Sequence, residues 1–255
     1  EVYSAVFSPL GETVLTASTD WTAKVWSVAT GECHLTLEQH RDAVSWAVFS
    51  KDEEGSRILT ASADGTAKLW TSDDGAELVS FGKAGGPCMY MATMTSAGHL
   101  VATAAAEKRA KIWIATAGAD CGKCLANLPH GGHVKFVAFT PDDELLVTAS
   151  EDCTAKLWTS SSGECVHVLR GHTSEIYTAL PCRTGKLVVT GSEDSLAMVW
   201  DISTGEKLLT LEGHGDSVCM ADFSPDGDQI ITASWDHSAR IWCARSGELL
   251  AILEG

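Results

Sequence analysis

The sequence lacks any uninterrupted apolar run near the length of about 18 residues that suggests a membrane span. It also begins without the basic segment and following apolar segment of a secretory signal peptide. Positive charge is scarce, since 18 Lys and Arg face 34 Asp and Glu and leave a net charge of −16. This charge repels phosphate backbones and anionic membranes and favours a basic partner. We therefore expect a soluble intracellular protein, most simply cytoplasmic, although a nuclear or cytoskeletal location stays open, that binds neither nucleic acid nor membranes.

Motifs typical of enzymes are missing as well. The sequence has no phosphate-binding loop of the GxxxxGK[ST] type, no HExxH zinc motif and no GxSxG nucleophile turn. Nine cysteines in 255 residues are few for a disulfide scaffold, and their odd number indicates free thiols in a reducing compartment. We therefore expect no catalytic residues, no cofactor and no small-molecule substrate.

What the sequence does contain is one string in six versions. It reads TASEDCTAKLW from residue 148 and TASWDHSARIW from residue 232, and a more divergent copy, TAAAEKRAKIW, begins at residue 103. The tryptophans that close the copies lie 42 to 45 residues apart, at Trp26, Trp70, Trp113, Trp158, Trp200 and Trp242. A period in this range is typical of repeat architectures, in which each unit buries its apolar face against its neighbours.

Each repeat has the pattern of four short strands. Hydrophobic residues alternate with a period of two, and turn signals such as SPDG at 224–227 and SGE at 246–248 separate the runs. Three cysteines, Cys33, Cys124 and Cys165, stand where the last strand of a unit begins. Both faces of these strands are apolar, which predicts sheets packed on one another. The expected units are approximately residues 1–39, 40–84, 85–129, 130–171, 172–213 and 214–255.

These residues resemble the WD-repeat (WD40) β-propellers over essentially the whole chain. The matching pieces are Gly-His at 171–172 and 213–214, SPDG at 224–227, Ser-x-Asp at 234–236 and the Trp six positions after that Asp. The resemblance implies an all-β fold with six four-stranded antiparallel blades in one domain over residues 1–255, possibly within a larger propeller. It also implies that the turns after the second and fourth strands of each blade form one rim, the top.

The resemblance further implies a structural network of one His, one Ser, one Asp and one Trp in each blade. A carboxylate only accepts hydrogen bonds and an indole only donates them, while imidazole and hydroxyl groups do both and can link the two. The complete sets are His40, Ser62, Asp64 and Trp70; His130, Ser150, Asp152 and Trp158; His172, Ser192, Asp194 and Trp200; and His214, Ser234, Asp236 and Trp242.

Two units depart from this pattern. In the third, Gly85, Ala105 and Glu107 stand at the His, Ser and Asp positions, so only Trp113 remains and the blade is expected to be less well braced. In the first, the His position lies before Glu1, while Ser18, Asp20 and Trp26 are present.

The same polar residues allow two other interpretations. A His, Ser and Asp set resembles a hydrolase triad, but an enzyme needs one such site and here it recurs in at least four units. Cys121, Cys124, His130 and His133 resemble a zinc site. The repeat phase places Cys124 and His130 at opposite ends of one strand, about 20 Å apart at about 3.3 Å per residue, whereas zinc ligands need bonds of about 2 Å. We therefore expect no metal.

The family resemblance implies three positions per blade that face partners on the top rim: three residues after the His, five after it, and the residue before the Asp. Tyr and Trp there combine a large contact area with a polar tip, as at interface hot spots. Alternatively, the tyrosines narrow the channel mouth, Trp235 packs on its neighbouring turn, and the glutamates are ordinary solvated turn charges. The predicted partner-binding residues are Trp235, Tyr177, Glu175, Tyr90, Tyr3, Glu193, Glu151, His133 and Lys135.

The resulting functional hypothesis is a non-catalytic scaffold that binds a peptide or protein domain, with basic side chains, on the top rim. Three alternatives stay open: a ubiquitin-ligase substrate receptor, a structural subunit of a cytoskeletal or axonemal assembly, and an enzyme whose mechanism uses none of the motifs above. The Trp-Asp-x-Arg docking pattern of such receptors is incomplete here, because Trp200-Asp201 is followed by Ser203. Since both ends of the chain fall within a repeat motif, we also expect a segment of a longer protein.

Overall fold

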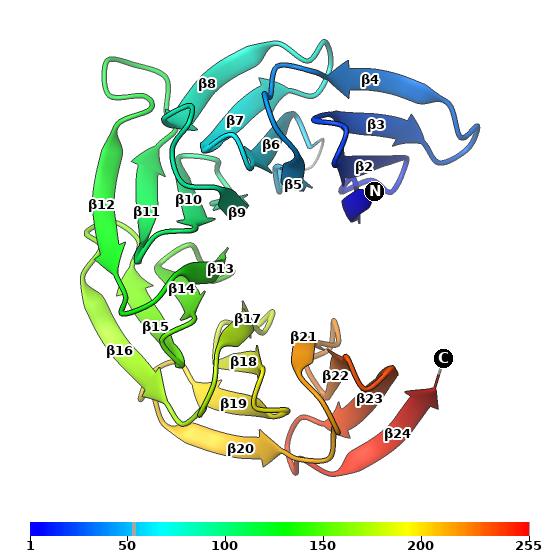
Figure 1. The fold of residues 1–255 in the computed structure, drawn as a ribbon, viewed down its shortest axis with the longest axis vertical. Helices are drawn as coiled ribbons and strands as arrows, with labels where there is room; N and C mark the ends of the chain where they lie inside the picture. Colours follow the sequence, from blue (N-terminus) through cyan, green and yellow to red (C-terminus); the bar gives the residue numbers. More distant parts are fainter. Residues whose placement is uncertain (53–54, 255) are drawn as a thin grey trace. The chain divides into compact units, whose positions relative to one another are not determined.

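The computed structural model describes residues 1–52 and 55–254, and we report the structure of these residues only. They fold entirely into strands and turns, so that within them no helix is long and apolar enough to cross a membrane. Each predicted repeat forms one sheet of four consecutive antiparallel strands (Figure 1). The prediction of an all-β chain with six four-stranded blades is therefore confirmed.

The strands follow the repeat closely. The first twelve are β1 (Val2–Phe7), β2 (Thr13–Ser18), β3 (Ala23–Ser27), β4 (Cys33–Leu37), β5 (Val44–Phe49), β6 (Arg57–Ser62), β7 (Thr66–Thr71), β8 (Glu77–Gly82), β9 (Met89–Met94), β10 (Leu100–Ala105), β11 (Arg109–Ile114) and β12 (Cys124–Pro129). The other twelve are β13 (Val134–Phe139), β14 (Leu145–Ser150), β15 (Thr154–Thr159), β16 (Cys165–Arg170), β17 (Ile176–Pro181), β18 (Leu187–Ser192), β19 (Ala197–Asp201), β20 (Lys207–Leu211), β21 (Val218–Phe223), β22 (Gln229–Ser234), β23 (Ser238–Cys243) and β24 (Leu249–Glu254).

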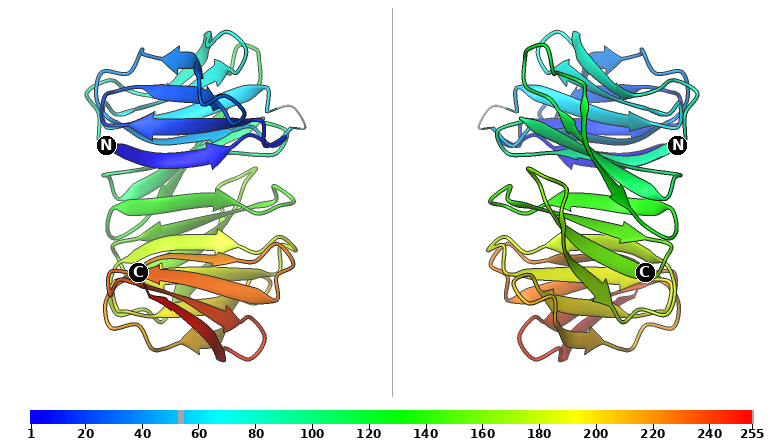
Figure 2. Two further views of the ribbon diagram at one scale, coloured as in Figure 1. Left: turned by 90° about the vertical axis from the view of Figure 1, so that its right-hand side faces the viewer. Right: turned by 90° about the vertical axis from the view of Figure 1, so that its left-hand side faces the viewer.

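The chain divides into two compact units, residues 1–127 and 128–255, which we describe separately. Within each unit the first strands of neighbouring sheets are in contact, β1 with β5 and β5 with β9 in one, β13 with β17 and β17 with β21 in the other. Within each unit the strands run from one rim of the sheets, which carries the turns after the second and fourth strands, to the opposite rim (Figure 2). The single domain over residues 1–255 stays a prediction.

Neighbouring sheets pack through the two faces that the period of two creates. In the first unit, Leu15, Val25 and Leu37 of one sheet contact Ile58 and Trp70 of the next. Burial of one such side chain contributes about 1.5–3 kcal/mol. We call the face that packs on the following sheet the forward face, and the face that packs on the preceding sheet the backward face.

The first strand of each blade carries an irregularity at the top rim, the edge with the turns after the second and fourth strands. In β17 the register shifts between Ile176 and Thr178, which makes Tyr177 the extra residue of a β-bulge. A bulged residue leaves the hydrogen-bonded ladder and can aim its side chain in a new direction. The same position is occupied by Tyr3, Tyr90 and Lys135 in other blades. The bulge therefore presents these four side chains at the rim.

Candidate partner-binding site on the top rim

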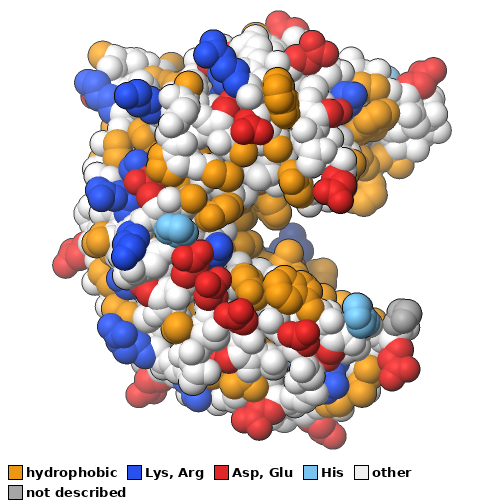
Figure 3. Space-filling view, in the orientation of Figure 1, with side chains coloured by type: hydrophobic (Ala, Val, Ile, Leu, Met, Phe, Trp, Pro, Cys, Tyr) orange, Lys and Arg blue, Asp and Glu red, His pale blue; other side chains and the backbone are white. Residues whose placement is uncertain are grey.

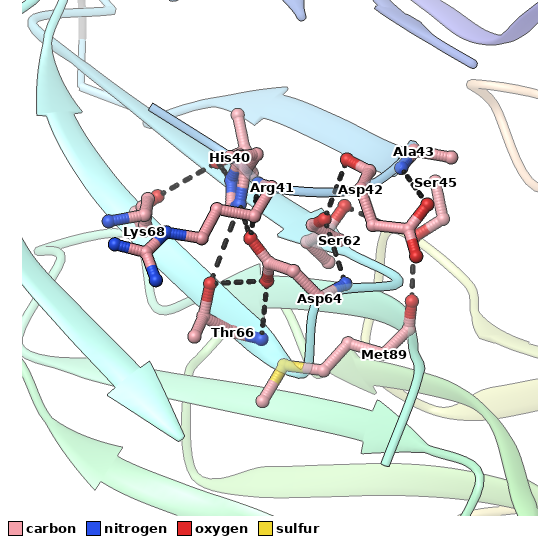
Figure 4. A network of polar contacts seen from close by, with 12 residues as sticks. His40, Arg41, Asp42, Ala43, Ser45, Ser62, Asp64, Thr66, Lys68 and Met89 are labelled. Carbon is pink, nitrogen blue, oxygen red and sulfur yellow. Dashed lines mark hydrogen bonds and ion pairs between the residues drawn. The ribbon is translucent and has the colours of Figure 1, made fainter. Parts of the chain in front are cut away.

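A buried chain of hydrogen bonds fixes each complete blade at its top turn. In the second blade, Thr60 Oγ1 lies 2.9 Å from Trp70 Nε1 and 2.7 Å from His40 Nε2. His40 Nδ1 lies 2.9 Å from the Asp64 carboxylate, which also accepts from the Thr66 hydroxyl (Figure 4). The Asp64 carboxylate only accepts hydrogen bonds, so His40 Nδ1 donates to it, and burial lowers the pKa of His40, which keeps the ring neutral. His40 Nε2 then accepts from the Thr60 hydroxyl, which itself accepts from the Trp70 indole N–H. His40 is then neutral, with its proton on Nδ1 and directed at Asp64.

The same chain recurs three times in residues 128–254. The distances between the Trp Nε1, Thr Oγ1, His Nε2 and Asp carboxylate atoms stay between 2.7 and 3.0 Å in each of these blades. The three additional sets are Trp158, Thr148, His130 and Asp152; Trp200, Thr190, His172 and Asp194; and Trp242, Thr232, His214 and Asp236.

The hydroxyl that links Trp to His differs from the one that the family resemblance implied. Ser62 forms no hydrogen bond with the imidazole; it donates to the backbone oxygen of Asp42 and accepts from the backbone N–H of Asp64. Thr60 makes the link because it stands two residues earlier on the same face of the strand, where the indole and imidazole meet. The serines at positions 150, 192 and 234 likewise hold the backbone of the turn.

The third blade keeps only part of this arrangement. Trp113 Nε1 still donates to Thr103 Oγ1 at 2.9 Å, but no imidazole follows, because Gly85 occupies the His position. Glu107, at the Asp position, points to other partners and forms ion pairs with Lys111 at 2.7 Å and Arg109 at 3.7 Å. The first blade similarly retains the bond from Trp26 to Thr16.

The imidazoles of these networks have the character of structural groups. Burial lowers the pKa of His130 to about 4, although the charge of Asp152 acts in the opposite direction. Burial also acts to raise the pKa of Asp152, but hydrogen bonds from Thr154, Gly131 and His130 outweigh it and hold this pKa at about 2. Both nitrogens of His130 are engaged by Asp152 and Thr148, which leaves no lone pair for a metal ion. No His, Cys, Asp and Glu group in residues 1–52 and 55–254 has the arrangement of a metal site.

Two aromatic side chains meet on the top rim of the second unit. The ring centroids of Tyr177 and Trp235 lie 5.6 Å apart, with an angle of 40° between the ring planes. Trp235 is exposed, while its backbone N–H donates to the oxygen of Ser217 at 3.0 Å and so fixes the turn. The structure therefore joins a bulged Tyr of one blade to a turn Trp of the next, in a pair that offers a rigid surface to solvent.

Carboxylates surround this aromatic pair. Burial, together with the negative charges of Glu193 and Glu175, raises the pKa of the Tyr177 hydroxyl. The Ser174 hydroxyl donates to the Glu193 carboxylate, and the Glu193 backbone N–H donates to the oxygen of Glu175 at 2.9 Å. Figure 3 shows this combination as acidic side chains beside hydrophobic ones over the ends of β13, β17 and β21.

In the preceding blade, Glu151, the counterpart of Glu193, forms an ion pair with a lysine of the same blade. Lys135, which stands at the bulge position of Tyr177, places its Nζ 2.6 Å from Glu151 Oε1. His133 Nδ1 lies 3.2 Å from the other oxygen of the same carboxylate. The charge of Glu151 is therefore balanced within its own blade.

The structure thus brings together seven of the nine predicted partner-binding residues, all within the second unit. Tyr3 is exposed and Tyr90 is half-buried, and both belong to the first unit. The sequence reasoning missed Ser174, which holds Glu193, and Asp216, whose charge also acts on Tyr177. It also missed the four linking threonines, although the Thr of each TAS string repeats as regularly as the Ser. The partner-binding roles themselves stay predictions.

A known protein family matches most of this chain. The profile of the family described as WD domain, G-beta repeat (WD40) matches residues 1–27, 31–71, 122–159, 163–201 and 205–243. The longest unmatched stretch contains most of the third blade, which has lost its His, Ser and Asp.

Several known proteins have sequences similar to part of this chain. The "WD repeat-containing protein pop1" of Schizosaccharomyces pombe is 25% identical over 173 residues, 68% of this chain and 22% of that protein. "Pre-mRNA-processing factor 19" of Oryza sativa subsp. japonica is 38% identical over 74 residues, 24% of this chain and 14% of that protein. "Apoptotic protease-activating factor 1" of Danio rerio is 43% identical over 54 residues, 20% of this chain and 4% of that protein.

This chain thus corresponds to about a fifth or less of the length of each relative. The family match, in contrast, extends over most of the chain and includes the first three strands of the four blades that have complete hydrogen-bond networks and of the first blade. The chain therefore belongs to the WD40 (WD domain, G-beta repeat) family.

Proposed function

We propose that this chain is a non-catalytic interaction scaffold that holds a peptide or protein domain, with basic side chains, on the top rim of its second unit. WD repeats are in general protein-interaction modules, which gives the broad class. The observation that carries the finer proposal is the pair of the half-buried Tyr177 and the exposed Trp235 beside Glu175 and Glu193.

The aromatic pair has the properties of an interaction hot spot. Tyr and Trp supply large contact areas and have only two rotatable side-chain bonds, so that little conformational entropy is lost on binding. The bulge at Tyr177 and the backbone hydrogen bond of Trp235 hold both side chains on rigid elements. Such anchors commonly contribute 2 kcal/mol or more, roughly, to the free energy of binding.

The carboxylates indicate the charge of the partner. In the fourth blade Lys135 occupies the bulge and neutralises Glu151. In the fifth blade Tyr177 occupies the bulge, so Glu193, the counterpart of Glu151, accepts from the Ser174 hydroxyl in place of a cation, and Glu175 beside it forms no ion pair within the described residues. A Lys or Arg of the partner would supply the missing cation, orient the bound peptide and speed its association.

The cellular setting of this role is also a proposal. All nine cysteines are free thiols, which fits a reducing, intracellular compartment. Nothing in residues 1–52 and 55–254 favours the ubiquitin-ligase receptor or the assembly subunit over the general scaffold.

The proposal is tested by affinity capture with cross-linking, using the wild-type chain and two tryptophan variants. Trp235→Ala should lose the cross-linked partner, whereas Trp21→Ala, which removes an exposed Trp from a turn of the first unit, should retain it. Equal capture by both variants and the wild type would place the binding surface elsewhere.

The charge of the partner is tested with a peptide array in which every Lys or Arg peptide has a partner peptide with norleucine at the same position. We expect binding to favour the basic peptides and to fall with added salt. Glu175→Lys should slow association more than it changes dissociation. Equal binding of the two peptide sets would refute the basic partner, while the capture experiment would still decide the scaffold role.

A further inference from the structure

A cavity of about 410 Å³ lies at the top rim of the second blade. Its volume is within the range of about 300–1,000 Å³ that is common for ligand sites. The cavity opens on the backward face of the blade, because Lys68 stands two residues before Trp70, which packs on the preceding sheet, and Ser80 pairs with Lys68. The polar residues that line the cavity are Gln39, Arg41, Asp64, Thr66, Lys68 and Ser80.

One cation of this cavity has no partner. The Arg41 guanidinium forms no hydrogen bond or ion pair with the described residues, 1–52 and 55–254. The backbone of Arg41, in contrast, is fixed, because its N–H donates to Asp64 Oδ2 at 2.9 Å. Figure 4 shows the Arg41 side chain extending from this point past Asp64 and Thr66 toward Lys68. A guanidinium held in this way on a cavity wall can receive an anion.

The two carboxylates near the cavity are already engaged. Asp64 Oδ2 accepts from the imidazole of its blade and from the Arg41 N–H, and Oδ1 accepts from the N–H and the hydroxyl of Thr66. Glu77 Oε2 lies 2.6 Å from Lys68 Nζ and balances its charge. Because only the charge of Arg41 is left over, the cavity suits a monoanion such as a carboxylate. The negative charge of Asp64 disfavours a dianion such as phosphate.

This arrangement is specific to the second blade. The other complete blades have no cation directly after the network His, where they carry Gly131, Thr173 and Gly215. The Ser80 position is aliphatic in two of these blades, at Val168 and Ile252. Three blades thus close the same hydrogen-bond network without a cation at this point, so the network does not require Arg41.

We propose that this cavity binds the side-chain carboxylate of an Asp or Glu in a partner peptide. A guanidinium and a carboxylate form two parallel hydrogen bonds, which fix the orientation of the bound group. The Gln39 amide and the Ser80 hydroxyl have no hydrogen-bond partner among residues 1–52 and 55–254, and they can bind the polar groups of the peptide backbone. The proposal concerns the first unit alone and is independent of the basic partner proposed for the second unit.

The experiment is an NMR titration of the full chain, with the Nε–H signal of Arg41 as the readout. The probe is glutamic acid blocked as its N-acetyl N-methylamide, and the control probe is glutamine blocked in the same way. The Arg41 signal should move to saturation with the blocked glutamic acid, with a dissociation constant on the order of 1 mM, and should stay in place with the blocked glutamine. An Arg41 signal that moves with neither probe would overturn the proposal.

Two further probes identify the anion and its source. Acetate offers a carboxylate without a peptide group and should bind about threefold or more weakly than the blocked glutamic acid, because it lacks the neutral hydrogen bonds. Inorganic phosphate should also bind more weakly than the blocked glutamic acid. Equal binding of acetate would assign the cavity to free carboxylates, and tighter binding of phosphate would assign it to phosphate groups. Either result would refute an acidic peptide as the occupant.

Two arginine variants test the residue that carries the site. Arg41→Thr introduces the residue that the fifth blade has at this position, Thr173, so the variant should fold. With the backbone amide of Ser80 as the readout, Arg41→Thr should raise the dissociation constant of the blocked glutamic acid by about tenfold or more. Arg109→Thr, the control, removes an exposed Arg of the first unit from outside the cavity and should leave this constant unchanged. Equal constants for the wild type and Arg41→Thr, or equal losses in the two variants, would contradict the role of Arg41.

Discussion

Replacement of Asp194 by Ala tests the energetic role of the buried networks. The Asp194 carboxylate lies 2.8 Å from His172 Nδ1 and accepts the backbone N–H groups of Thr173 and Leu196 at 2.9 and 3.1 Å. The His172 side chain is fully buried, so the variant leaves its Nδ1–H without a partner, which costs about 1–3 kcal/mol. The two backbone donors lie near water and lose less. We expect a total loss of about 2–3 kcal/mol in the free energy of unfolding.

The assay is urea unfolding combined with a thermal melt, and Glu107→Ala is the control. At about 2–4 °C per kcal/mol for a chain of this size, Asp194→Ala should lower Tm by about 5–10 °C. Glu107 forms only partly exposed ion pairs with Lys111 and Arg109, so its loss should cost less than about 1 kcal/mol. Equal losses for the two variants would refute the reasoning that burial of the His donor sets the cost.

Three further predictions concern the link, acid stability and the rim. Thr190→Val, which leaves Trp200 Nε1 without an acceptor, should destabilise the chain by about 2 kcal/mol or more and cost more than Ser192→Ala in the same urea assay. The pKa of His130 is lowered to about 4 in the folded chain, so the contribution of His130 to the free energy of unfolding is complete above its unfolded pKa near 6.5 and declines as pH falls toward 4. The pKa of Asp152 is lowered to about 2, so the contribution of Asp152 declines as pH falls below about 3.8. Urea midpoints should therefore fall from pH 7 to pH 3, and a flat profile would contradict this. Trp235→Ala should weaken binding of a captured partner by about 30-fold, or about 2 kcal/mol, in a titration while Tm stays nearly unchanged, and a lowered Tm with unchanged affinity would make it a packing residue.

The sequence predicts most of the fold because six copies of one pattern indicate the same four strands in every blade. Alternation of apolar residues places the strands, and Cys33 and Cys165 begin β4 and β16 as expected. The linking Thr60 was overlooked because the polar set was taken from the family pattern, which emphasises Ser62. Its position in every TAS string made it visible in principle.

The candidate site was less predictable, because it depends on contacts between blades. The sequence marks Tyr177 and Trp235 as rim residues, but not that their rings meet, since the two belong to different repeats. The ion pair of Lys135 with Glu151 depends on a bulge, and the residues around it carry no signal for a register shift. Periodicity thus predicts which face a residue occupies, while tertiary packing determines its neighbours on the rim.

Each complete hydrogen-bond chain joins residues of a single repeat, and this confines the effects of sequence drift. The His, Thr, Asp and Trp that close the second blade all come from residues 40–70, and the other sets are equally local. The third blade has lost three members of its set, while the networks of the second, fourth, fifth and sixth blades remain intact. A change in one repeat therefore leaves the hydrogen-bond chains of the other repeats in place. The rim carries Lys135 in one blade, Tyr177 in the next and Trp235 beyond it, while the buried chain of each of these blades is complete.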